Sequence, residues 1–273
     1  MSNPRVRNED VEFINLETAA SMKTGVRVTM SKGFPALYSE CLKNICYCKN
    51  IPIIRVIHPN MGKDRKTGED RQKRLFELTA QTSLPVMWYN DERPRSNWSE
   101  QLALCERIGT GPKLVPDNMR ERAEMFGLCA IILAEDGMLW NSRIVNDNPL
   151  GRKYGYSKAA SLEAPDKMAG VIKLVCDRLA EQKRNGSPYL VGNRLTAVDI
   201  YWATMSYNLL VPDEDFMPPT TKSQMMKIMF GNLPFAVEAV LDKAIVLEHR
   251  EYILRKYCEV PVVLGGQSLK SAL

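Results

Sequence analysis

The stretch 82–100 constrains the fold of this chain more than any other segment. Pro85 opens an apolar run, Val86 to Tyr89, whose β-branched and aromatic residues favour a strand. A turn signal follows, and then an extended piece that contains Pro94. Because proline cannot donate to a ladder, we expect this piece to be an edge strand. Ser99 then stands before a helical run, as an N-cap does.

Strand, turn, edge strand and capped helix together form a layout that can bind a ligand. The exposed strand backbone can pair with an extended peptide, and the helix N-terminus can hold a carboxylate. An ordinary hairpin followed by a helix would show the same residues, so both interpretations stay open at this point.

Two strands and two helices are predicted ahead of this stretch. Gly25 to Met30 favours a strand, apolar residues at helical spacing follow Pro35, and 52–57 favours a second strand. A β-α-β unit of this length implies a parallel pair with a right-handed crossover. A further helix over 71–80 gives the order β-α-β-α-β-β-α, which is complete by about Ile108.

The pattern divides the chain into two domains. Residues 1–24 lack periodicity and are expected to form a poorly ordered extension. An α/β domain over 25–108 is followed by a linker over 109–118, rich in glycine and proline. From there to the end, 119–273, the spacing of apolar residues is helical, which predicts an all-helical domain.

One local motif in the second half is specific. Thr196 is followed three residues later by Asp199, an acidic variant of the capping box, in which each residue satisfies an orphan N–H group. A glycine-containing segment, Tyr189-Leu-Val-Gly, comes just before it. The motif predicts a helix that starts after Thr196, with Asp199 in a structural role.

Charge and hydropathy exclude several classes of function. The net charge of +5 is mild, and the densest basic run, 63–74, is interrupted by acids, so nucleic acid is not an expected partner. No apolar run approaches the ~20 residues that span a bilayer. The polar, acid-containing N-terminus fits neither a signal peptide nor a transit peptide, which indicates a cytoplasmic protein.

Cysteines and histidines do not predict a metal site. The seven cysteines are an odd count, and the only histidines are His58 and His249. We expect reduced, mostly buried thiols. His58 ends a predicted strand before a proline, and His249 lies among charged residues, so both are expected at the surface.

The chain resembles the glutathione transferase superfamily over about residues 25–258. Leu84-Pro85-Val86 is similar to the family's cis-proline before its third strand, and Asn97-Trp98-Ser99 occupies the place of its Glu/Gln-Ser pair. Tyr189-Leu-Val-Gly with the capped Leu195–Ile200 is similar to the family's sixth helix and is the most specific signal. The resemblance implies a thioredoxin-like α/β domain, then an all-α helical bundle, and a possible homodimer.

The resemblance also implies glutathione binding, with no metal. The turn at Pro85 would leave the Val86 N–H and C=O free to pair with the cysteinyl part of the tripeptide. Ser99 would hold the γ-glutamyl carboxylate at a helix N-terminus. This chain departs from the family at Trp98, because an indole can donate or stack but cannot accept a hydrogen bond from the ligand's ammonium. Candidate replacements for that acceptor are Glu92 and Glu100.

The expected catalytic position lies in the segment 31–39. Catalysis needs a thiolate, and a free thiol has a pKa of about 8.5. Ser31, with Lys32 adding positive potential, is the first candidate donor to the sulfur, and Tyr38 is the second. Phe34 would wall the pocket. Loop capping or core packing would account for the same residues, and no cysteine is present for disulfide exchange.

The expected activity is conjugation of glutathione, as co-substrate, to a small hydrophobic electrophile. By the resemblance, Trp140 and Arg143 would line the apolar substrate pocket, although capping the core is an equal alternative. Two further functions stay open. One is a non-catalytic binding or scaffold protein, suggested by Trp98 and by the lack of an unambiguous catalytic hydroxyl. The other is a glutathione-dependent isomerase or lyase, which the sequence does not separate from a transferase.

Overall fold

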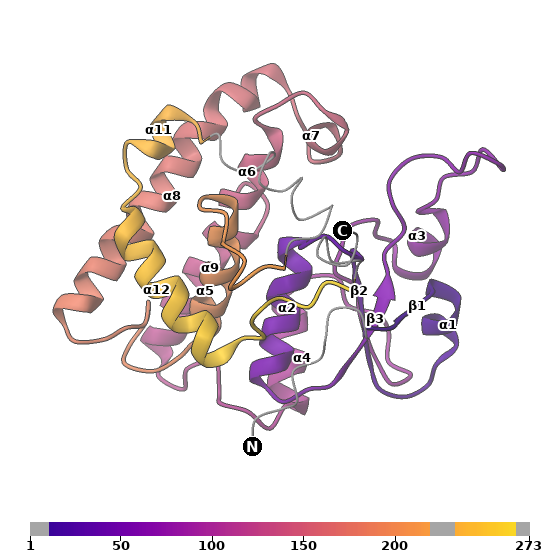
Figure 1. The fold of residues 1–273 in the computed structure, drawn as a ribbon, viewed down its shortest axis with the longest axis horizontal. Coiled ribbons are helices and arrows are strands. Elements are labelled where there is room, and N and C mark those ends of the chain that lie inside the picture. The colour runs from indigo at the N-terminus through magenta and orange to yellow at the C-terminus, as the bar shows by residue number, and fades with distance from the viewer. Residues whose placement is uncertain (1–10, 219–232, 266–273) are drawn as a thin grey trace. The chain divides into compact units, whose positions relative to one another are not determined.

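The computed structural model describes residues 11–218 and 233–265, which form two compact units (Figure 1). The first unit contains 11–111, 212–218 and 259–265 of the described residues, and the second contains 112–211 and 233–258. The change from one unit to the next falls at Gly111-Pro112, inside the predicted linker. A Cβ on Gly111 would lie 2.0 Å from the carbonyl oxygen of Cys48, so only glycine fits where the chain passes the end of the first unit's helix.

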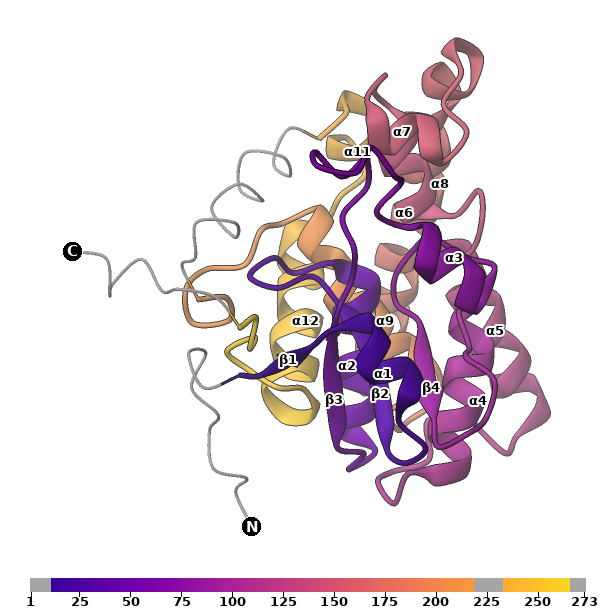
Figure 2. The ribbon, with the colours of Figure 1, turned by 90° about the vertical axis from the view of Figure 1, so that its right-hand side faces the viewer.

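The first unit is a mixed sheet with helices on both faces. Its elements are β1 (Phe13–Ile14), α1 (Leu16–Ser21), β2 (Val26–Met30), α2 (Leu37–Cys48), β3 (Ile53–Ile57), α3 (Lys73–Thr79), β4 (Met87–Tyr89) and α4 (Trp98–Ile108). The strand order is β1-β3-β2-β4, with β4 antiparallel to β2 and the other pairs parallel (Figure 2). This is the predicted thioredoxin-like arrangement.

The predicted edge strand is reduced to one bridge. Met87 and Arg95 exchange two main-chain hydrogen bonds of 2.8 Å. In the described part of the chain, these two bonds form an isolated bridge that does not extend into a strand pair. Pro94, next to this bridge, has no N–H with which to extend it. The two faces of the sheet are covered by different helices, with α2 and α4 on one side and α1 and α3 on the other (Figure 1). On the α3 side, Leu75 packs with Val86 and Trp88 of the strand region.

The expectation of a poorly ordered extension is wrong for residues 11–24. Phe13–Ile14 pairs with β3 as an edge strand, and α1 follows it directly. The side chain of Arg27 in β2 is only 1% exposed and holds α1 in place. Its guanidinium donates to the carbonyl oxygens of Ala19, at 3.1 Å, and Met22 at the end of α1. Residues 1–10 lie outside the described part of the chain.

The expectation that 119–273 is wholly a helical domain also needs correction. Residues 259–265 contain no helix and belong to the first unit. Leu264, 2% exposed, accepts a 2.8 Å hydrogen bond from the Gly33 N–H through its carbonyl oxygen. Glu259 Oε2 lies 3.1 Å from Lys43 Nζ and 3.4 Å from Arg55. Apolar burial and paired charge therefore fix this segment on the first unit.

The second unit is all-helical in its described residues, as predicted. Its α-helices are α5 (Met119–Leu133), α6 (Met138–Ile144), α7 (Pro149–Lys153), α8 (Lys158–Arg184), α9 (Ala197–Met205), α11 (Phe235–Glu238) and α12 (Lys243–Tyr257). A 3-10 turn, η2 (Ser206–Asn208), extends α9. Every residue of α9 is buried, so this helix forms the centre of the unit. No described helix is long and apolar enough to cross a membrane.

The predicted capping box at the start of α9 is present. Asp199 Oδ2 accepts hydrogen bonds from the Thr196 N–H at 2.8 Å and from the Thr196 hydroxyl at 2.9 Å. Its other oxygen, Oδ1, accepts from the Leu190 N–H at 2.7 Å. The buried carboxylate therefore joins the start of α9 to the segment before it, which is the structural role expected of Asp199.

Candidate functional site

The loop between β2 and α2 brings four predicted site residues to the start of α2. Ser31 and Phe34 are half-buried, and Lys32 is exposed, with its Nζ 5.8 Å from the centre of the Phe13 ring. Tyr38 lies half-buried in the first turn of α2. The N-cap of α2 is an alanine without a side-chain hydrogen bond, so no side chain of the capping residue covers this helix end.

Pro85 follows a cis peptide bond, as predicted, but the expectation of free main-chain groups on Val86 is wrong. The Val86 N–H donates to Thr29 Oγ1 at 2.7 Å, and the Val86 carbonyl accepts from the Thr29 N–H at 2.9 Å. Pairing between β2 and β4 thus continues one residue beyond the strand and uses both groups of Val86. A peptide cannot add at Val86 without breaking these bonds.

The open main chain lies at Leu84, which the sequence analysis did not single out. Among the residues that the structure describes, no partner contacts the N–H or C=O of Leu84. The neighbouring Pro85 carbonyl is occupied by Gln101 Nε2 at 2.9 Å. Continued past Val86, the register of β2 and β4 sets Leu84 opposite Ser31. The main-chain groups of Leu84 are open and those of Val86 are paired because of the register between β2 and β4, which cannot be read from the sequence.

The start of α4 is capped by Asn97, so the expectation that Ser99 is the N-cap is wrong. Asn97 Oδ1 accepts from the Ser99 N–H at 2.9 Å and from the Ser99 hydroxyl at 2.8 Å. Glu100 Oε1 accepts from the N–H groups of Ser96 and Asn97, which completes a capping box. An asparagine three residues before a glutamate was the sequence signal for this cap.

The charges at this helix end are already paired. Desolvation acts to raise the pKa of Glu100, but hydrogen bonds from the Asn97 and Ser96 amides and the charge of Arg93 outweigh it, so this pKa lies below its ordinary value. Glu92, the other candidate acceptor, lies 2.5 Å from Arg107 and also pairs with Arg95. A ligand carboxylate at this end would have to displace the Asn97 side chain from Ser99 and would lie near Glu100. Trp98, the first residue of α4, is half-buried.

In the helical unit, Trp140 and Arg143 of α6 come together on Tyr154. The Trp140 and Tyr154 rings meet edge to face with centroids 4.9 Å apart, and the Arg143 guanidinium carbon lies 4.1 Å from the centre of the Tyr154 ring. The structure thus brings the two predicted pocket residues into one aromatic cluster, where both have packing partners. Whether they also contact a substrate stays a prediction.

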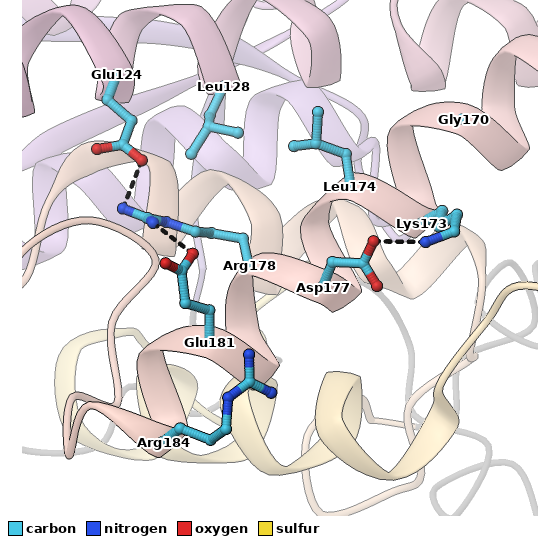
Figure 3. Close-up of a pocket in the computed structure, with 9 residues that line it drawn as sticks. All are labelled: Glu124, Leu128, Gly170, Lys173, Leu174, Asp177, Arg178, Glu181 and Arg184. Carbon is cyan, nitrogen blue, oxygen red and sulfur yellow. Dashed lines mark hydrogen bonds and ion pairs between the residues drawn. The ribbon is translucent and has the colours of Figure 1, made fainter.

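Two adjacent shallow clefts lie along α8, and neither is lined by Trp140 or Arg143. One measures about 610 Å³ and the other about 550 Å³, and Gly170 lines both. Most charged side chains of the larger cleft form pairs, either along α8 or, for Arg178, also with Glu124 of α5 (Figure 3). Arg178 lies 2.5 Å from Glu124 and 2.8 Å from Glu181. The charges of Glu124, Arg178 and Glu181 are therefore satisfied within the chain, and Figure 3 shows Arg184 in the same cleft without an interaction with the other residues drawn.

The described residues hold no group of three or more His, Cys, Asp and Glu side chains that could bind a metal ion. Both histidines are buried, at 8% exposure for His58 and 5% for His249, so the expectation of surface positions is wrong. His58 follows β3, and its N–H donates to the Met30 carbonyl. This hydrogen bond continues the pairing between β2 and β3 one residue beyond the strand.

The two units, a thioredoxin-like sheet and an all-helical unit, define the glutathione transferase fold. Yeast Ure2p in complex with S-hexylglutathione shares this fold, with a TM-score of 0.58 and 12% identity over 87% of this chain and 97% of that one. A glutathione S-transferase from Methylobacillus flagellatus with bound glutathione has a TM-score of 0.58 and 10% identity, over 85% of this chain and 95% of that one. A glutathione S-transferase domain-containing protein from Marinobacter aquaeolei has a TM-score of 0.57 and 15% identity, over 84% of this chain and 98% of that one.

These similarities are similarities of fold, since the identities are low. No family model and no curated protein matches the sequence. The chain therefore has a glutathione transferase fold whose site residues have to be assigned from its own geometry.

Proposed function

We propose that this chain binds glutathione on its thioredoxin-like unit and conjugates the thiol to a small apolar electrophile. The observation that carries the proposal is the unpartnered main chain of Leu84, which the register sets opposite Ser31 among the described residues. An N–H and a C=O on one residue at the end of a strand pair can exchange two hydrogen bonds with the cysteinyl residue of the tripeptide. Glutathione bound to structures with this fold supports the choice of ligand.

The thiol of a cysteinyl residue held at Leu84 would lie toward the loop that precedes α2. A hydroxyl that donates to the sulfur stabilises the thiolate and lowers the thiol pKa. Ser31 is the first candidate for this donor and Tyr38 the second, and Lys32 adds a positive charge to the same loop. Thiolate formation and proximity of the bound electrophile would then accelerate conjugation. The homodimer and the cytoplasmic location stay predictions.

A second candidate function is non-catalytic binding, and one observation favours it. The Ser99 N–H and hydroxyl both donate to Asn97, and the Gly33 N–H donates to Leu264. Polar groups that a ligand could use at the two helix starts are thus already satisfied within the chain. The nitrogen regulation fragment of the yeast prion protein Ure2p has the same fold, so this fold also occurs in a protein named for regulation.

Calorimetric titration with glutathione, followed by a conjugation assay with a chlorodinitrobenzene, tests the proposal. Binding with conjugation supports the transferase. Binding without conjugation of several electrophiles supports a non-catalytic binding protein, or an isomerase or lyase if a suitable substrate turns over. The absence of binding overturns the proposal and favours a non-catalytic scaffold, for which the occupied groups of Ser99 and Gly33 are the supporting observation. The matched control ligand is S-hexylglutathione, which tests the site without a free thiol.

A further inference from the structure

Three tyrosine hydroxyls and one ammonium meet at the end of α12. Tyr252, Lys256 and Tyr257 lie on this helix, and Tyr189 comes from the connection between α8 and α9. Tyr189 Oη lies 2.6 Å from Tyr257 Oη and 3.3 Å from Tyr252 Oη. Lys256 Nζ donates to Tyr252 Oη at 2.8 Å. None of these residues belongs to the proposed glutathione site.

The ammonium makes the Tyr252 oxygen an acceptor, whereas the two hydrogen bonds between phenols can run in either direction. An ammonium can only donate, and each phenol carries one proton. When Tyr257 donates to Tyr189 and Tyr189 donates to Tyr252, the Tyr252 oxygen accepts two hydrogen bonds, one of them from a charged donor. Its own proton then takes no part in the cluster. Loss of that proton would keep every hydrogen bond and place a negative charge beside the ammonium.

The groups that face Tyr252 agree with this arrangement. Hydrogen bonds from Lys256 and then from Tyr189 lower the pKa of Tyr252, against the opposing effect of burial. Burial, followed by its two phenolic neighbours, raises the pKa of Tyr189. One turn earlier on α12, Glu248 is paired at 2.5 Å with Lys183 of α8, so this pair adds no net charge.

We propose that Tyr252 is a nucleophilic phenol and the site at which this protein is modified by acyl or sulfonyl electrophiles. Tyr252 is half-buried and Lys256 is exposed, whereas Tyr189 is only 8% exposed, so an electrophile can reach Tyr252 more easily than Tyr189. In the reaction with an arylsulfonyl fluoride, a Tyr252 O–S bond forms and the S–F bond breaks. Fluoride leaves with the electron pair, and the phenolic proton passes to water.

Labelling of the full chain with an arylsulfonyl fluoride near neutral pH, followed by peptide mass spectrometry, tests the proposal. We expect Tyr252 to be modified faster than the other nine of the ten tyrosines. Lys256→Met should slow its labelling about tenfold, the change in phenolate fraction for one pKa unit, and Lys256→Arg should largely restore it. Lys158→Met, at the exposed start of α8 and far along this helix from Lys183, is the matched control and should leave the Tyr252 labelling rate unchanged.

Two results would overturn the proposal. One is preferential labelling of another tyrosine or of Lys256 itself. The other is a Tyr252 rate that does not respond to Lys256→Met, with folding of the variant verified by circular dichroism. Because the assay contains no glutathione, its outcome is independent of the proposed transferase function.

Discussion

Asp199 Oδ1 lies 3.1 Å from Nε2 of His249, and both side chains are buried. This contact joins the capping box at the start of α9 to the middle of α12. The same carboxylate accepts hydrogen bonds from Leu190 and Thr196, so one buried acid connects three segments of the helical unit. His249 is therefore part of the core of this unit, although its neighbours in the sequence are charged.

Replacement of the capping residues should destabilise the helical unit. Thr196→Ala should lower the free energy of unfolding by roughly 0.5–2 kcal/mol, as for other N-caps. Asp199→Ala should cost more, because each buried N–H left without a partner costs about 1–3 kcal/mol. Urea denaturation gives both values, and glutathione binding measured by calorimetry should change little. Lost affinity at unchanged stability would show that the motif belongs to the ligand site.

Removal of the Ser31 hydroxyl should act on the bound thiol. One hydrogen bond to a charged group is worth about 1.5–3 kcal/mol, which corresponds to one to two pKa units at 1.36 kcal/mol each. Ser31→Ala should therefore raise the thiol pKa by about that amount and slow conjugation at neutral pH by roughly ten- to a hundredfold. Titration of thiolate absorbance measures the shift. If Tyr38→Phe gives the shift instead, Tyr38 is the donor.

Asn97→Ala should separate helix capping from ligand binding at the start of α4. The loss of its cap should destabilise the protein by about 1 kcal/mol. The substitution also frees the Ser99 N–H and hydroxyl, which now donate to Asn97. If a ligand carboxylate binds at Ser99, affinity for glutathione should hold or rise in this variant. A fall in affinity equal to that of Ser99→Ala would indicate that Asn97 itself contacts the ligand.

Glu100 should make stability depend on pH in the acid range. Its pKa in the folded protein lies below the ordinary value of 4.5, so its contribution is present above that value and is lost as the pH falls through the folded pKa. Glu100→Gln should lower stability by about 0.5 kcal/mol at neutral pH, as for other charges at helix N-termini. The difference between the two proteins should vanish in acid. Glu135→Gln, at an exposed position, is the control.

Glu259 should stabilise the first unit through Lys43. Burial alone would lower the pKa of Lys43, but the carboxylates of Glu40 and Glu259 outweigh it and hold this pKa above its ordinary value. Glu259→Gln should lower the free energy of unfolding by about 1–3 kcal/mol, because a buried charge loses a partner. The effect should shrink in a Lys43→Met background, where no ammonium needs pairing. Glu251→Gln, exposed on α12, should be neutral.

Local patterns predicted the fold well, and long-range contacts explain what they missed. The Thr196 cap needs only residues within one turn, so sequence spacing was sufficient to find it. Glu259 pairs with Lys43, and Arg27 also donates to the carbonyl oxygen of Asn90. These partners lie far along the chain, and nothing in the sequence near Glu259 or Arg27 indicates them. At the start of α4, Ser99 was the predicted cap. The actual cap is Asn97, and its local signal is Glu100 three residues later.

At the candidate site, too, local sequence patterns predicted some residues, and others depend on long-range pairing. Ser31, Lys32 and Tyr38 lie together because they are close in the sequence, at the end of β2 and the start of α2. The choice between Val86 and Leu84 depends on how β4 is registered against β2, and on a threonine hydroxyl that occupies the Val86 N–H. A one-residue difference in pairing changes which main-chain groups are open, and this difference is visible only once the strands are paired.

The segment 259–265 has a consequence for how this protein is made. A ribosome releases residues 11–111 first, but the carbonyl of Leu264 and the carboxylate of Glu259 emerge only after the helical unit has been translated. Until then the Gly33 amide and the Lys43 ammonium lack these partners. Domains generally fold as units during synthesis, with the N-terminal one first. Here the first unit to begin is the last to be completed.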